Sequence, residues 1–60
     1  MSETDFTGAD LIGAYLIRAD LNDSILVDAN LKDANLWSAD LGGANLLRAN
    51  LKRTRLWRAN

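Results

Sequence analysis

The sequence predicts an all-β solenoid, in which short extended pieces of chain wind repeatedly around one axis. Leucine recurs at every fifth position from Leu11 to Leu56, ten times without a gap, and Phe6 extends the series toward the N-terminus. Two positions before each member of this series stands a small residue, Ala, Ser or Thr. The repeat fills almost the whole 60-residue chain, so internal repetition decides the fold class.

A period of five excludes both a single helix and a single long strand. On an α-helix, which advances about 100° per residue, successive leucines would lie roughly 140° apart and could not form one stripe. On a strand, Leu11 and Leu16 would point to opposite faces, because side chains alternate. All leucines can point toward one axis only if the chain turns once in every five residues.

Charge identifies the positions that face this axis. In five-residue units counted from Thr4, only the first (small) and third (leucine) positions carry no charged residue in any unit. An interior cannot hold unpaired charge, so these two positions form the predicted core. A small residue beside each leucine suits a narrow coil, since the backbone turns there while leucine fills the axis.

The units are similar to those of the pentapeptide-repeat family, whose consensus is Ala, then Asp or Asn, then Leu and two variable residues. The units that carry this resemblance are Ala9-Asp10-Leu11, Ala19-Asp20-Leu21, Ala29-Asn30-Leu31, Ala34-Asn35-Leu36, Ala39-Asp40-Leu41, Ala44-Asn45-Leu46 and Ala49-Asn50-Leu51. The resemblance implies a right-handed quadrilateral β-helix with four units in each coil. This chain would then form about three coils.

We expect residues 1–3 to be a short lead-in and residues 4–60 to be the β-helix. A solenoid normally needs caps over its terminal coils. The sequence stops at Ala59-Asn60, two residues into a unit without its leucine. The expectation is therefore either a piece of a longer solenoid, truncated or uncapped at its C-terminus, or a chain whose last coil is covered by a partner.

The composition argues against an enzyme. The chain contains no Cys and no His, which removes thiolate chemistry, the usual general base and the commonest metal ligand. We expect no catalytic residues, no cofactor, no metal and no small-molecule substrate. The N-terminus is acidic and no long apolar run follows it, so we expect a cytoplasmic protein without a membrane segment.

Polar residues at the outward positions have a structural interpretation. Asp or Asn at the second position suits a turn, because a short side chain can bond to nearby main chain, and the four glycines are expected to ease turns. Stacking in steps of twenty, as four units per coil require, places Asp28 under Arg48 and Asp33 under Arg53. We interpret these columns as surface ion pairs; a metal or phosphate site is the alternative.

The candidate partner-binding surface is a column of large apolar residues at the fourth position. It comprises Ile17, Trp37 and Trp57, with Arg18, Ser38 and Arg58 beside them. These side chains could shelter the ladder beneath them, form a protein–protein contact, stack on nucleic-acid bases or lie on a membrane surface. Further apolar residues that could extend the patch are Ile12, Tyr15, Ile25, Val27 and Leu47.

The function that these observations favour is a non-catalytic structural or protein-interaction module. We expect a protein partner or self-association, and neither nucleic acid nor membrane as a partner. The alternative is a DNA-mimicking modulator of DNA gyrase, an activity that the family resemblance implies for some members. Charge argues against it: all eight acidic residues lie at or before Asp40, and five of the seven basic residues follow it.

Overall fold

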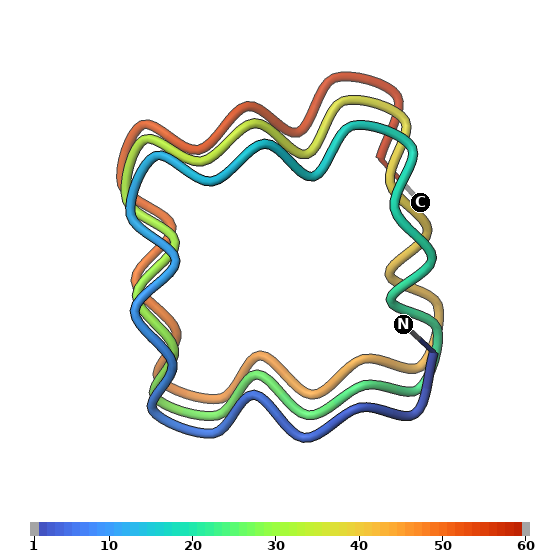
Figure 1. Ribbon diagram of the computed structural model, residues 1–60, viewed down its shortest axis with the longest axis vertical. Coiled ribbons are helices and arrows are strands. Elements are labelled where there is room, and N and C mark those ends of the chain that lie inside the picture. The colour runs from blue at the N-terminus through green and yellow to red at the C-terminus, as the bar shows by residue number, and fades with distance from the viewer. Residues whose placement is uncertain (1, 60) are drawn as a thin grey trace.

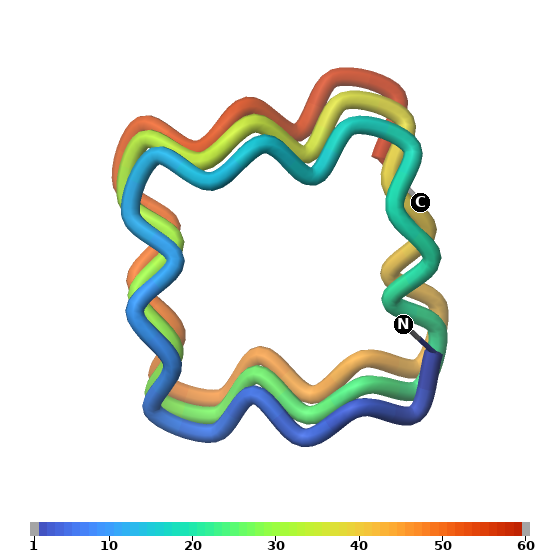
Figure 2. Tube along the Cα trace, in the orientation of Figure 1, coloured from blue at the N-terminus to red at the C-terminus, as the bar shows by residue number. Residues whose placement is uncertain are grey.

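The computed structural model describes residues 2–59 as a right-handed quadrilateral β-helix (Figures 1 and 2). Viewed down the axis, successive coils lie over one another as a square, and the molecule measures 21 × 19 × 14 Å. The predicted fold is therefore confirmed. Met1, which belongs to the predicted lead-in, and Asn60, which belongs to the last unit, lie outside the described residues.

Within residues 2–59 the strands are reduced to single parallel β-bridges at the second position of the unit, and no helix is present. Every bridge joins residues twenty apart. The bridges are Asp5–Ile25, Asp10–Asn30, Tyr15–Asn35, Asp20–Asp40, Ile25–Asn45, Asn30–Asn50 and Asn35–Arg55. This spacing confirms that four units make one coil.

Each side of the square stacks units that are twenty residues apart. The first side holds residues 4–8, 24–28 and 44–48, the second 9–13, 29–33 and 49–53, the third 14–18, 34–38 and 54–58, and the fourth 19–23 and 39–43. In Figure 1 the first side lies at the bottom and the third at the top. The first and third sides are therefore opposite each other.

Main-chain hydrogen bonds join the coils at three positions of each unit. On the second side, the N–H of Leu11 donates to the Asn30 carbonyl at 2.8 Å, and the N–H of Asn30 donates back to the Ala9 carbonyl at 2.9 Å. The N–H of Gly13 donates to the Lys32 carbonyl at 2.9 Å. This ladder pairs the main-chain N–H and C=O groups, which in other folds are paired within helices or long strands.

A β-turn at each corner changes the direction of the chain. The leucine carbonyl accepts a hydrogen bond from the residue three positions later, as from the N–H of Ala34 to Leu31 at 2.9 Å. The fifth position of the unit has positive φ throughout, from 56° at Arg53 to 71° at Gly43, which is the hallmark of a type II turn. Gly8, Gly13 and Gly43 adopt this φ without the steric cost that a side chain brings.

Gly42 differs from the other three glycines because it occupies the fourth position and does not have positive φ. A Cβ atom there would lie 2.9 Å from Asn22 Oδ1 and 3.2 Å from Asp40 Oδ1. The expectation that glycine eases turns holds for three glycines, whereas Gly42 instead leaves room for two neighbouring polar side chains.

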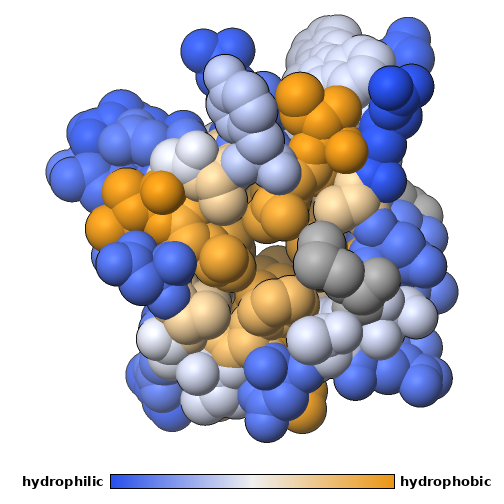
Figure 3. Space-filling view, viewed as in Figure 1, coloured by the Kyte–Doolittle hydropathy of each residue, from blue (hydrophilic) through white to orange (hydrophobic). Residues whose placement is uncertain are grey.

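The core lies in the middle of the chain, between residues 21 and 39. The inward side chains of this stretch are almost completely removed from solvent: Leu21, Ser24, Leu26, Ala29, Leu31, Ala34, Leu36 and Ala39. The leucines before and after this stretch are only partly covered, and Leu56 is 42% exposed. Figure 3 shows apolar side chains around the axis and hydrophilic side chains around the rim. Burial therefore depends on a coil lying on both sides.

Hydroxyl residues at the first position are satisfied by hydrogen bonds. The N–H of Thr4 donates to Ser24 Oγ at 3.3 Å, and Thr54 Oγ1 donates to the Leu31 carbonyl at 2.7 Å. Among residues 2–59 no buried side-chain nitrogen or oxygen lacks a hydrogen-bond partner. Ser and Thr can thus replace Ala at this position without leaving a buried polar group unpaired.

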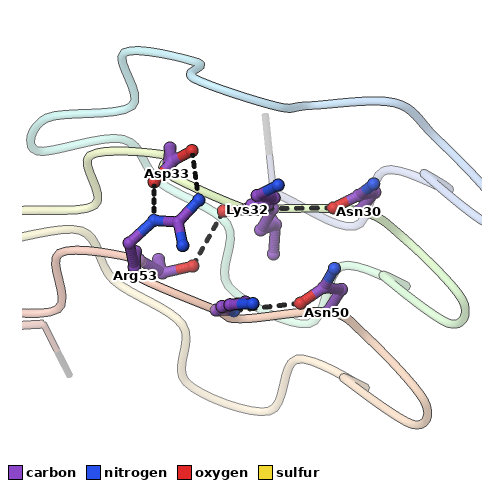
Figure 4. Close-up of polar contacts among 8 residues, drawn as sticks. Asn30, Lys32, Asp33, Asn50 and Arg53 are labelled. Atoms are coloured by element: carbon purple, nitrogen blue, oxygen red, sulfur yellow. Dashed lines mark hydrogen bonds and ion pairs between the residues drawn. The ribbon is translucent and has the colours of Figure 1, made fainter.

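Asp and Asn at the second position form Asx turns, as predicted. Their Oδ1 atom accepts a hydrogen bond from the N–H of the fourth residue of the same unit, for example from Trp37 to Asn35 at 3.1 Å. Figure 4 shows the same contact at Asn30 and Asn50. At Asp5 the N–H and the hydroxyl of Thr7 both donate to Oδ1, and the pKa of this carboxyl is lowered because these hydrogen bonds favour its charged form.

The two predicted ion pairs are present between the second and third coils. Arg48 binds Asp28 through Nε at 2.7 Å and Nη2 at 3.2 Å, and Arg53 binds Asp33 at 2.7 and 3.3 Å (Figure 4). Hydrogen bonds from each guanidinium lower the pKa of Asp28 and of Asp33 below the ordinary value of 3.8. These pairs support the twenty-residue register at two neighbouring corners.

We expect Leu31→Ala to lower the free energy of unfolding by about 2–5 kcal/mol, because it opens a cavity in the buried middle of the β-helix. Leu56→Ala is the matched control, since Leu56 is 42% exposed and its truncation should cost clearly less. Urea denaturation followed by circular dichroism measures both. Equal losses would contradict the burial gradient along the axis.

Asn35→Ala should lower the free energy of unfolding by about 0.5–1.5 kcal/mol, because the Trp37 N–H loses its acceptor. The reverse change, Tyr15→Asn, creates an Asx turn where a tyrosine is 84% exposed, and it should raise stability. Thermal unfolding of the two variants checks the assignment. A loss of stability in Tyr15→Asn would count against it.

Acid should weaken the two ion pairs. Because the folded-state pKa values of Asp28 and Asp33 are depressed, their stabilising contribution is present above the ordinary value of 3.8 and is lost as the pH falls through the folded values. The double variant Arg48→Gln, Arg53→Gln should therefore lose less stability than the parent protein between pH 6 and pH 2. Urea midpoints across that range provide the measurement, and parallel curves would argue against the pairs.

Candidate interaction surface

The structure brings together the apolar column that the sequence predicts. Ile17, Trp37 and Trp57 occupy the fourth position of the three units on the third side. The N–H of Arg18 donates to the Trp37 carbonyl at 2.8 Å, and the N–H of Ser38 donates to the Trp57 carbonyl at 2.9 Å. The ladder thus holds the three residues one above another at the end of this side.

Exposure differs among the members of the column. Trp57 is 70% exposed and Ile17 43%, whereas Trp37 is half-buried because a coil lies on each side of it. Arg18 and Arg58 are exposed at the adjoining corner, and Ser38 between them is half-buried. The column therefore shelters its central tryptophan and leaves its two outer members in contact with solvent.

Tyr15 lies on the same side as the column, but most of the other exposed apolar residues do not. Tyr15 is 84% exposed at the second position of the third side. Ile12 belongs to the second side, while Ile25 and Leu47 lie on the first side. The idea that Ile25, Val27 and Leu47 extend the patch is wrong, because the first side, which carries all three, faces away from the third.

Charge is segregated by side as well as along the axis. The outward residues of the third side include Arg18, Arg55 and Arg58 and no acidic residue. The fourth side carries Asp20, Asp23 and Asp40, and its described residues include no basic one. This arrangement was missed in the sequence because only the charges before and after Asp40 were compared. Adding the charges of units that lie twenty residues apart would have shown the difference between the sides.

The described residues form no enclosed binding site. No pocket is detected in this part of the chain, and residues 2–59 contain no group of three Asp, Glu, His or Cys side chains that could hold a metal ion. The Asp20–Asp40 column lies on an open side, where both carboxylates accept hydrogen bonds from main-chain N–H groups two residues later. No helix in the described chain has the length and apolar character to cross a membrane.

Comparison with known proteins agrees with this architecture. The pattern that defines pentapeptide repeats matches residues 1–37 and 29–60, with eight copies. No curated protein matches the chain.

Two solved structures are similar to the chain. A pentapeptide repeat protein (Rfr23) from the cyanobacterium Cyanothece 51142 is 42% identical over 100% of this chain and 41% of its own, with a TM-score of 0.99. A pentapeptide repeat protein from the Arabidopsis thaliana thylakoid lumen is 42% identical over 95% of this chain and 43% of its own, with a TM-score of 0.53. The chain spans about two fifths of the length of each.

The five-residue register, the twenty-residue coil and these matches lead to the same conclusion. The chain belongs to the pentapeptide repeat family.

Proposed function

We propose that this chain is a non-catalytic interaction module that binds a protein partner, or a second copy of itself, through its third side. The observation that supports the proposal best is the exposure of Trp57, 70%, beside Tyr15 at 84% and Ile17 at 43%. Aromatic residues and arginine are enriched where proteins bind each other, and tryptophan, tyrosine and arginine most often carry the binding energy.

The polar side chains support a non-catalytic role. Second-position carboxylates are used as acceptors in Asx turns, as in Asp20 and Asp40, and Asp28 and Asp33 are engaged with arginines. General acid–base catalysis requires titratable groups that converge on a substrate in a cleft. The flat sides of this β-helix present their charged groups outward instead.

The alternative, a DNA-mimicking modulator of gyrase, has less support. A mimic of DNA requires an evenly acidic surface, since the phosphates carry one negative charge per ~1.7 Å of duplex. Here the fourth side is acidic, but the third side carries three arginines and no carboxylate. A partner that binds the third side would therefore meet a basic, aromatic surface.

Self-association should depend on concentration and on Trp57. We expect Trp57→Ser to weaken it by about tenfold or more, because truncation of a central aromatic residue costs over 1 kcal/mol at a typical interface. Leu47→Ser is the control, since Leu47 is 56% exposed on the opposite side. Sedimentation velocity over a concentration series measures the effect.

A stable monomer at every concentration, together with no partner retained by the immobilised chain, would remove the support for an interaction module. Equal weakening by Leu47→Ser and Trp57→Ser would assign the contact to general surface hydrophobicity and not to the third side.

A further inference from the structure

We propose that the third side recognises an acidic segment of its partner, with a carboxylate bound to the main-chain N–H of Trp57 between Arg55 and Arg58. This inference rests on the proposed function and specifies the chemistry of the partner. It follows from the main-chain N–H of the fourth residue of the unit. In most units the side chain at the second position accepts a hydrogen bond from this N–H.

The Asx turns define where a carboxylate or amide oxygen lies on this surface. In eight units the Oδ1 atom at the second position accepts the N–H of the fourth residue at 2.9–3.2 Å. The eight acceptors are Asp5, Asp10, Asp20, Asn30, Asn35, Asp40, Asn45 and Asn50. An oxygen acceptor at this point is thus the rule of the repeat.

Three units lack this acceptor because their second residue is Tyr15, Ile25 or Arg55. Within the described chain, the N–H groups of their fourth residues, Ile17, Val27 and Trp57, have no hydrogen-bond acceptor. Two of these donors lie on the third side, in the same column as Trp37, whose N–H is bound by Asn35. An external oxygen could occupy the corresponding position at Trp57.

Local charge singles out Trp57 among the three donors. Arg55 projects from the second position of the same unit, where an Asx carboxylate would otherwise lie, and Arg58 follows Trp57 in the chain; both are exposed. Val27 instead precedes Asp28, whose carboxylate is already bound to Arg48. A main-chain donor beside two guanidinium groups favours an anion.

A protein carboxylate fits this surface better than an isolated ion. Arginine binds carboxylates with two parallel hydrogen bonds, and the exposed indole of Trp57 offers an apolar contact to a neighbouring side chain of the same segment. The carboxylates of the fourth side, Asp20 and Asp40, would repel an acidic segment that shifted around the corner. The expected ligand is therefore an acidic stretch that also carries apolar residues.

The test uses a fluorescein-labelled peptide of alternating Glu and Leu, with a Gln–Leu peptide of the same length as the uncharged control. We expect the Glu–Leu peptide to bind the full chain and its affinity to fall as salt rises. Fluorescence anisotropy gives the dissociation constant.

Three variants separate the contributions of the arginine charge and of the Trp57 N–H to peptide binding. Arg55→Asn removes the cation and supplies the usual Asx acceptor to Trp57, so it should weaken binding by about tenfold or more while keeping the fold found in eight other units. Arg55→Gln removes only the cation and should weaken binding less. Arg53→Gln removes an arginine that is already paired with Asp33 and should change affinity less than about twofold.

Equal affinity for the Gln–Leu peptide, or undiminished affinity of Arg55→Asn, would overturn the proposal. Competition against the labelled peptide tests nucleic acid as the ligand. If a single-stranded oligonucleotide displaces the labelled peptide at a lower concentration than the unlabelled peptide does, the proposal is overturned in favour of nucleic acid. If Trp57→Ser abolishes association of the chain but the acidic peptide does not bind, the interaction module stands and the carboxylate site falls.

Discussion

The structure depends on one turn, repeated at every corner, in which a leucine carbonyl accepts the N–H of the residue three positions later. This turn sets the inward direction of the first and third positions and the outward direction of the others. It requires positive φ at the fifth position, which nine non-glycine residues also adopt within the described chain. The backbone cost is repeated in each unit, so it must be offset by the ladder and by burial in the neighbouring coils.

The same turn separates the inward residues, which pack against each other, from the outward residues, which can contact a partner. Residues that fill the axis are buried in the middle of the β-helix, and residues at the outward positions contribute little to this core. The charges of the third and fourth sides can therefore differ strongly although their cores are alike, because Leu36 and Leu21 lie in equivalent surroundings. A pentapeptide repeat protein thus offers a uniform frame whose sides carry independent chemistry, and the proposed binding through the third side depends on that independence.

The sequence was sufficient to predict the axis, because it follows from position in the unit. The twenty-residue register, and with it the ion pairs of Asp28 and Asp33, followed from the family resemblance, which implies four units in each coil. It did not reveal how exposure differs between Trp37 and Trp57, which depends on whether a further coil covers the residue. It also missed the N–H of Trp57, which has no acceptor among residues 2–59. This N–H is recognised only by comparison with the other units, in which an Asp or Asn Oδ1 at the second position accepts the hydrogen bond that Arg55 cannot accept.

The twenty-residue step between paired residues has a kinetic consequence. Inter-coil hydrogen bonds, such as that from Leu31 to Asn50, join groups nineteen residues apart, about a third of the chain. Contacts so far apart in the sequence predict slow folding, since the entropy of closing a whole coil is lost before the first ladder bond forms. Once two coils are joined, the next can add on an existing template. We therefore expect the meeting of the first two coils to limit the folding rate.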